Sequence, residues 1–146
     1  MTKPIFILSL FAFVLTGNIS AQYISDIQAT KTGIHHVSAR DFYQSINKVE
    51  NPQILDIRTS REYAGGHIKG AVLIDYYNPN FARNIEKAGL DKNQPVFVYC
   101  RSGNRSGHAM SIFKKAGFKN VYNLQYGIKD WVRNRLPLER GMPSHN

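Results

Sequence analysis

The chain has 146 residues, a length that suits one domain. Nineteen lysines and arginines outnumber ten acidic residues, and the formal net charge is +9 at pH 7. The basic residues are scattered, so we expect no nucleic-acid partner and attribute the charge to solubility and the attraction of small anions. The single cysteine, Cys100, excludes an internal disulfide and is either a buried structural thiol or a reactive one.

The first residues have the composition of an export signal. Lys3 precedes the apolar stretch PIFILSLFAFVL, and Ala21 offers a small residue at a cleavage point. The stretch is shorter than the roughly 20 apolar residues of a transmembrane helix. We therefore expect 1–21 to be a signal peptide, with a periplasmic or secreted protein that is not inserted in a membrane after cleavage. An uncleaved membrane tether is the alternative.

The remaining sequence predicts one domain at 35–140, between a lead-in at 22–34 and a tail at 141–146. Short apolar runs alternate with helical periodicity, which is typical of an α/β fold with a mainly parallel sheet flanked by helices. The polar stretch 58–70 predicts a loop with room for one helical turn, and 71–75 reads as a buried strand. The expected strands are 35–37, 53–57, 71–75, 95–99 and 121–124.

Four helices are expected from capping residues and apolar spacing. Ser38 caps the first, with Asp41 at the capping-box position, and Asn80 caps the second. Gly89 and Gly117 end the second and third. The four helices are expected at 38–47, 80–89, 106–117 and 127–136. The residues expected to face the core are Phe42, Ile46 and Val49, then Ala109, Ile112, Phe113 and Ala116, then Ile128, Trp131 and Val132.

Cys100 follows the strand expected at 95–99 and precedes a helix, which is where open parallel sheets bind ligands. The N–H groups of the loop 101–106 lead into a helix N-terminus, so they can donate to a sulfur anion or an oxyanion. Gly103 lets the backbone curl. We expect the pKa of the Cys100 thiol to lie below its ordinary value of about 8.5, so that no general base is needed. His108 is expected at the surface.

Three segments resemble the rhodanese family of sulfurtransferases. CRSGNRS looks like the active-site loop of that family, and LDIRTSREYAGGHIKGAVLID resembles its strand–loop–strand signature. AGFKNVYNLQYGIKDW resembles its closing segment, so the resemblance covers roughly 36–131. Two positions depart from the family pattern. Tyr126 replaces the first residue of a usual glycine pair before the last helix, where it could narrow the pocket mouth, and Lys69 stands where proline is common.

The resemblance implies a single rhodanese-like domain with a five-stranded parallel sheet and a thiosulfate sulfurtransferase activity. It implies that Cys100 attacks the outer sulfur of a small anionic donor such as thiosulfate and holds that sulfur as a persulfide. The acceptor would be cyanide or a thiol, and a thioredoxin-like protein is a candidate source of that thiol. The residues expected to bind the substrate follow Cys100 directly, and they are Arg101, Ser102, Gly103, Asn104 and Arg105.

Other polar residues are weighed against ordinary structural roles. Asp56 and Arg58 end a strand on the side of Cys100 and either support the loop or form a local ion pair. Arg105 is expected to hold the loop by binding carbonyl groups or an acid, and His67 is expected to be structural. His35 and His36 stand without further ligands at metal spacing, so we expect no metal, and we expect no cofactor.

Alternative functions remain open at this point. The protein could be a persulfide or sulfide carrier with little turnover, a binding module for a redox partner, or a cysteine phosphatase or arsenate reductase. Four residues separate Cys100 from Arg105, whereas related phosphatases have five. A shorter loop directs a tighter ring of N–H groups at one sulfur and leaves less room for a tetrahedral oxyanion, which favours sulfur transfer.

Overall fold

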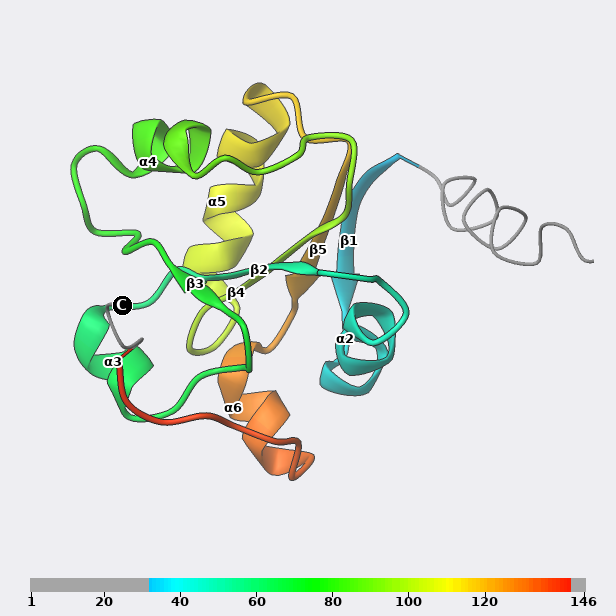
Figure 1. The fold of residues 1–146 in the computed structure, drawn as a ribbon, viewed down its shortest axis with the longest axis vertical. Helices are drawn as coiled ribbons and strands as arrows, with labels where there is room; N and C mark the ends of the chain where they lie inside the picture. The colour runs from blue at the N-terminus through cyan, green and yellow to red at the C-terminus, as the bar shows by residue number, and fades with distance from the viewer. Residues whose placement is uncertain (1–31, 143–146) are drawn as a thin grey trace, which may run out of the picture. The chain divides into compact units, whose positions relative to one another are not determined.

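The computed structural model describes residues 32–142. The expected signal peptide at 1–21, nearly all of the lead-in and the end of the tail lie outside the described residues. Five parallel strands form one sheet in the order β1-β5-β4-β2-β3 (Figure 1). The strands are β1 Gly33–Val37, β2 Gln53–Asp56, β3 Val72–Leu73, β4 Val96–Tyr99 and β5 Asn120–Leu124.

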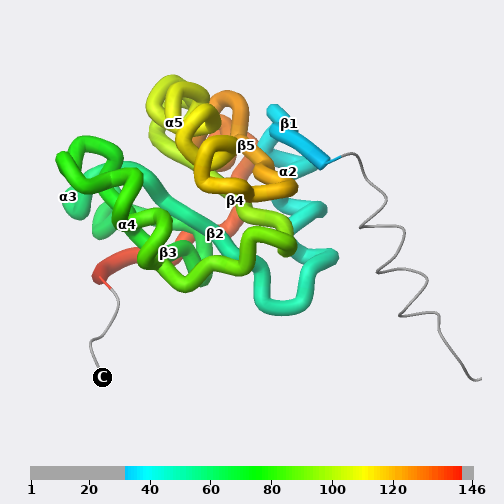
Figure 2. The backbone as a smooth tube through the Cα atoms, turned by 90° about the horizontal axis from the view of Figure 1, so that it is seen from above, coloured from blue at the N-terminus to red at the C-terminus, as the bar shows by residue number. Residues whose placement is uncertain are grey.

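Helices cover both faces of the sheet. One apolar cluster holds residues of α4 and α5, and the other holds residues of α2 and α6. The two views accordingly place α2 apart from α4 and α5 (Figures 1 and 2). The helices are α2 Ala39–Ile46, α3 Ser60–Ala64, α4 Phe81–Lys87, α5 Asn104–Lys115 and α6 Gly127–Arg133. None of these described helices has the length and apolar character needed to cross a membrane.

The expected α/β architecture is confirmed, and local sequence signals explain several elements. Ser38 caps α2 by accepting a hydrogen bond from the Asp41 N–H. Thr59 and Glu62 form a capping box that turns part of the expected loop 58–70 into α3. The central strand β4 is buried at all four positions, in keeping with its continuous apolar sequence.

Three expectations about burial and boundaries are wrong. The strand at 71–75 is only the two-residue edge strand β3, and Val72 is 55% exposed because nothing pairs with its outer side among the described residues. Val132 is 53% exposed because the short helix α6 presents Ile128 and Trp131 to the core instead. Helix α5 begins at Asn104, two residues before the expected start, because Gly103 takes the left-handed N-cap conformation.

Candidate active site

Strands β2 and β4 end side by side, which brings two groups of predicted site residues to one edge of the sheet. Asp56, the last residue of β2, pairs in register with Tyr99, the last residue of β4. Cys100 comes next along the chain. Because both strands are parallel, the loops that follow them leave the sheet on the same side.

The Cys100 sulfur lies inside the loop that leads into α5. The Gly103 N–H donates to Sγ at 3.2 Å, and the Ser106 N–H donates at 3.5 Å. The Ser106 Oγ lies 3.4 Å from the same sulfur. Cys100 as a whole is only 1% exposed. Three donors from one turn of chain therefore converge on a single buried sulfur atom.

These donors lower the pKa of the Cys100 thiol below its ordinary value. Burial acts in the opposite direction and raises the pKa, because it disfavours the charged thiolate. Hydrogen bonds from the Ser106 side chain and from the N–H groups of Ser106, Ser102 and Gly103 outweigh burial. The donors that lower the pKa are therefore mainly the hydroxyl and the backbone rather than the two neighbouring arginines.

Two glycines lock the cysteine loop against the turn between β5 and α6. Gly103 has φ +90°, and a Cβ there would lie 1.8 Å from the Gln125 carbonyl oxygen. Gly127 has φ +64°, and a Cβ there would lie 2.4 Å from the Arg101 carbonyl carbon. The Ile128 N–H also donates to the Cys100 carbonyl oxygen at 2.9 Å. The close approach of these two backbones requires glycine at both positions.

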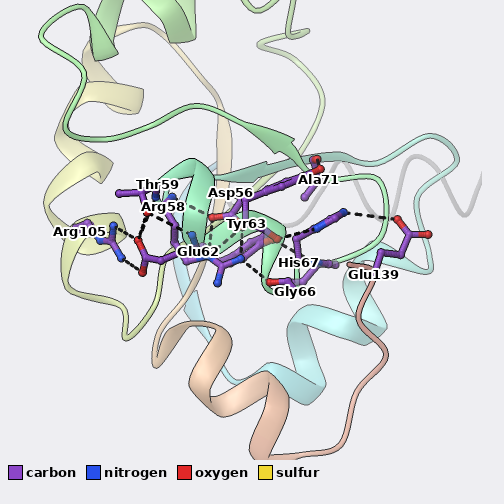
Figure 3. Close-up of polar contacts among 12 residues, drawn as sticks. Asp56, Arg58, Thr59, Glu62, Tyr63, Gly66, His67, Ala71, Arg105 and Glu139 are labelled. Atoms are coloured by element: carbon purple, nitrogen blue, oxygen red, sulfur yellow. Dashed lines mark hydrogen bonds and ion pairs between the residues drawn. The ribbon is translucent and has the colours of Figure 1, made fainter. Parts of the chain in front are cut away.

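Arg105 connects the cysteine loop to α3 through an ion pair with Glu62 (Figure 3). Its guanidinium donates to both carboxylate oxygens, at 2.9 and 2.7 Å, and lies 5.3 Å from the centre of the Tyr77 ring. The hydrogen bond from Arg105, helped by bonds from Thr59 and opposed by burial, lowers the pKa of Glu62 to about 2. The guanidinium is thus held by an acid of another element, which fixes the start of α5 beside α3.

Asp56 and Arg58 form a buried local ion pair. The Arg58 Nε donates to the Asp56 carboxylate at 2.8 Å, and its Nη2 donates to the Gly66 carbonyl oxygen at 2.7 Å. The guanidinium also lies 5.5 Å from the centre of the Tyr99 ring. Among the described contacts, the pair holds the chain that follows α3 and makes no hydrogen bond to the cysteine loop.

The remaining expected residues divide between the surface and the interior. Arg101, Ser102 and Asn104 are exposed around the loop, and so is His108. His67 is buried, stacks on Tyr63 with ring centres 3.7 Å apart, and lies 3.8 Å from the Glu139 carboxylate (Figure 3). Within 32–142, no three His, Cys, Asp or Glu side chains gather closely enough to hold a metal ion.

Sequence reasoning missed two residues of the site. Glu62 belongs to the capping box T-x-x-E, a signal that identifies a helix start but not its partner 43 residues away. Ser106 was expected only as the first residue of a helix, and nothing in its spacing singled out its hydroxyl. The expected curl at Gly103 brings the Ser106 hydroxyl to Sγ, and this contact is known only from the structure.

The fold and the site define a class of protein: an open parallel sheet with a low-pKa cysteine in a backbone cradle at the end of its central strand. The comparisons with known proteins agree with that class. Residues 38–134 match the rhodanese-like domain family, and the chain belongs to this family. The expected resemblance is therefore confirmed, and relatives of the chain include proteins named sulfurtransferase and sulfur carrier.

Named relatives differ in function and in length. The chain is 42% identical over 86 residues to thiosulfate sulfurtransferase GlpE of Pseudomonas fluorescens, covering 59% of this chain and 74% of GlpE. It is 35% identical over 103 residues to the putative sulfur carrier protein YrkF of Bacillus subtilis, covering 69% of this chain and 52% of YrkF. It thus spans about half the length of YrkF.

A solved structure shows the same fold. The crystal structure of a rhodanese-related protein from Thermoplasma volcanium superposes with a TM-score of 0.61 and 26% sequence identity. The match covers 72% of this chain and 97% of that protein.

Proposed function

We propose that this protein is an exported sulfurtransferase that carries a sulfane sulfur on Cys100. The observation that best supports this function is the set of three donors directed at one buried Sγ. Such a cradle stabilises negative charge on sulfur without a neighbouring base. Thiosulfate is the donor in the name of GlpE, and we propose it, or a related small anion, as the donor here.

The loading step is a displacement at sulfur. The Cys100 thiolate attacks the outer sulfur of thiosulfate, and a new bond forms between Sγ and that sulfur. The sulfur–sulfur bond of thiosulfate breaks, and sulfite leaves with its electron pair. The persulfide that remains has its charge on the outer sulfur. The N–H groups of the loop surround this position and can donate to it.

The transfer step reverses the roles. An acceptor thiolate or cyanide attacks the outer sulfur, and its electron pair forms the new bond to sulfur. The bond to Sγ breaks, and Cys100 leaves as a thiolate that the cradle again stabilises. The low pKa of Cys100 thus serves both steps, because it makes the residue a ready nucleophile and a good leaving group.

The exposed residues around the loop have supporting roles in this proposal. Arg101 attracts the anionic donor, and Ser102 and Asn104 line the mouth with polar groups. Gly103 supplies an N–H to the sulfur. Arg105, already bound to Glu62, holds the loop in shape rather than meeting the donor. Asp56 and Arg58 fix the neighbouring loop.

The proposal is tested with the purified mature protein in a thiosulfate:cyanide assay. Intact mass spectrometry after incubation with thiosulfate is expected to show one added sulfur of about 32 Da on Cys100. The same preparation is expected to hydrolyse aryl phosphates negligibly. Strong phosphatase activity together with no sulfur adduct would show that the cradle holds an oxyanion and that the proposed function is wrong.

A carrier function is the second candidate. The burial of Cys100 and the name of the relative YrkF favour it, because a buried persulfide is protected until a partner, such as a thioredoxin-like protein, docks. A carrier loads one sulfur rapidly but turns over slowly with cyanide or small thiols. Comparing the loading burst with the steady-state rate distinguishes this function from a multiple-turnover enzyme.

The proposed location rests on the first 21 residues and has its own test. Expression of the full chain in a bacterial host is expected to give a periplasmic or secreted protein that begins at Gln22. Intact mass of the exported protein measures this directly. If the protein is found in the membrane fraction with Met1 still present, the signal is not cleaved and the segment acts as a membrane tether.

A further inference from the structure

A cavity lies beside the cysteine loop, between the helices α3 and α6, which Figure 1 shows at the same end of the domain. Its volume is about 690 Å³. Arg101, the residue after Cys100, lines it, and the Lys129 N–H donates to the Arg101 carbonyl oxygen at 3.2 Å. We call this cavity the α3–α6 cleft. The residue that follows Cys100 along the chain therefore forms part of the wall of this cleft.

The charges on its walls are unequal. Five cationic side chains line the cleft, against one carboxylate, and they are Arg58, Arg61, Arg101, Lys129 and Arg133. The carboxylate belongs to Glu62 and is bound by Arg105, while Asp56 neutralises Arg58. Arg133 has a longer contact of 3.4 Å with Asp130 and is mostly exposed.

Three of the cations are left without a counter-charge. No carboxylate of residues 32–142 lies within ion-pair distance of Arg61, Arg101 or Lys129. All three are exposed, and they come from α3, the cysteine loop and α6, so they stand on different walls. Ile128, Val132 and Leu138 add apolar surface between them. A ligand with separated negative charges and a short aliphatic chain would complement this arrangement.

We propose that the α3–α6 cleft binds the sulfur acceptor, and that this acceptor is a small peptide-like thiol carrying two carboxylates. Cavities of 300–1,000 Å³ hold ligands of about this size, and thiosulfate alone would leave most of the cleft empty. The proposal rests on the proposed sulfur transfer by Cys100 and names its acceptor. The carboxylates pair with Arg61 and Lys129, and the thiol extends past Arg101 toward the outer sulfur, which stands about 2 Å beyond Sγ.

The chemistry of the transfer balances without an oxidant or reductant. The outer sulfur of the Cys100 persulfide first takes up a proton from water. The acceptor thiolate then attacks this sulfur and forms a new sulfur–sulfur bond. The bond from that sulfur to Sγ breaks, and its electron pair leaves on the Cys100 thiolate. The proton stays on the transferred sulfur, so the products are an acceptor persulfide and the resting enzyme. The cleft contributes binding and orientation of the attacking thiol.

The test compares two acceptors that share one thiol and differ in charge. The mature protein, from Gln22 onward, is loaded with sulfur from thiosulfate. Sulfur transfer is then measured to glutathione, a tripeptide thiol with two carboxylates, and to its diethyl ester. The double variant R61Q/K129Q is expected to raise the KM for glutathione about tenfold, because two exposed ion pairs are lost. The KM for the ester is expected to change less than about twofold, because it has no carboxylates to lose.

A matched control removes the same charge elsewhere. K114Q/K115Q deletes two cations from the last turn of α5, roughly 16 Å along the helix from the cysteine loop. This variant is expected to keep the wild-type KM for glutathione. Equal KM values for glutathione and its ester in the wild-type protein, or equal effects of the two double variants, would overturn the proposed acceptor site.

Binding is also measured without any reaction. S-methylglutathione cannot accept sulfur, and its calorimetric titration into wild-type protein is expected to give a Kd that rises about tenfold in R61Q/K129Q. This readout separates two failures. If Cys100 never gains a sulfur while S-methylglutathione binds in this charge-dependent way, the proposed function fails and the cleft stands. If sulfur transfer proceeds and S-methylglutathione does not bind, the cleft proposal fails alone.

Discussion

The carboxyl ends of β2 and β4 lie next to each other and use polar groups in opposite ways. At the end of β2, the carboxylate of Asp56 and the guanidinium of Arg58 neutralise each other in a buried pair. At the end of β4, two N–H groups and a hydroxyl are directed at Cys100, which has no cationic partner in direct contact among the described bonds. The charges at the end of β2 therefore balance each other, whereas the donors at the end of β4 stabilise negative charge on the Cys100 sulfur.

This difference teaches that position at the sheet edge does not by itself make a residue reactive. A buried ion pair whose charges neutralise each other has a structural role, because it has no net charge with which to attract another ion. A cradle of backbone donors around a titrating sulfur is satisfied only when the sulfur is charged. The following substitutions test whether the two ends divide the work in this way.

The largest effect on activity is expected from Cys100→Ser. The serine cannot form a persulfide, so sulfur transfer is expected to fall to background while the fold remains. The thermal midpoint is expected to stay within a few degrees of wild type, since the substitution removes little volume. The measurements are the thiosulfate:cyanide rate and a thermal melt. Transfer at the wild-type rate in this variant would show that the reaction does not pass through a persulfide on Cys100.

The largest effect on stability is expected from Asp56→Ala. The substitution leaves the Arg58 guanidinium buried without its partner, at a cost of roughly 3–5 kcal/mol in the free energy of unfolding. Urea unfolding measures it. Arg133→Gln, which removes an exposed ion pair, is the control and is expected to cost less than about 1 kcal/mol. If the two variants lose the same free energy of unfolding, the buried pair of Asp56 and Arg58 does not have the structural role assigned to it.

Glu62→Gln is expected to have an intermediate effect that depends on pH. It removes the charged partner of Arg105 and is expected to cost about 1–2 kcal/mol at pH 7, with slower sulfur transfer as the loop loosens. The folded pKa of Glu62, about 2, is below its ordinary value of 4.5. Its contribution to stability is therefore complete above pH 4.5 and is lost as the pH falls toward 2.

The measurement for Glu62 is urea unfolding of both proteins at pH 7, 4.5 and 2.5. The difference between wild type and variant is expected to shrink across that range. A difference that stays constant down to pH 2.5 would show that the carboxylate charge is not what holds Arg105.

The smallest effect is expected from Ser106→Ala. Loss of the hydroxyl leaves only the N–H donors of the loop on Sγ, so the pKa of Cys100 is expected to rise and alkylation at pH 7 to slow by a few-fold. Ser111→Ala is the matched control, because Ser111 lies on the same helix and its hydroxyl donates to the His108 carbonyl oxygen. An unchanged alkylation profile in Ser106→Ala would assign the low pKa to the backbone alone.

The sequence predicts the fold well where apolar patterns are strong. The run at 95–99 is a buried central strand, and the caps at Ser38 and Gly117 mark helix ends. Edge positions are harder, because an apolar run reads alike whether or not a strand pairs on both sides, and Val72 shows the result. Periodicity also could not tell that Val132 faces solvent in so short a helix.

The candidate site was predictable in its chemistry but not in its supporting contacts. A lone cysteine before glycine and serine indicates a cradle of N–H groups, and Cys100 lies in one. The pairing of Arg105 with Glu62 joins residues that are distant in sequence, and only the packing of α3 beside α5 brings them together. Two roles were expected for Asp56 and Arg58, support of the cysteine loop or a local ion pair, and the structure shows the local pair.

The interlocked glycines have a consequence for how the protein is made. Strand β5 lies between β1 and β4, and the Ile128 and Lys129 N–H groups bind the Cys100 and Arg101 carbonyl oxygens. These two backbone contacts on the cysteine loop can form only after residue 129 has been synthesised. At about 5–20 residues per second, a ribosome needs a few seconds to pass from Cys100 to that point. During that interval we expect the cysteine loop to lack the backbone contacts from α6 that hold its shape in the folded protein.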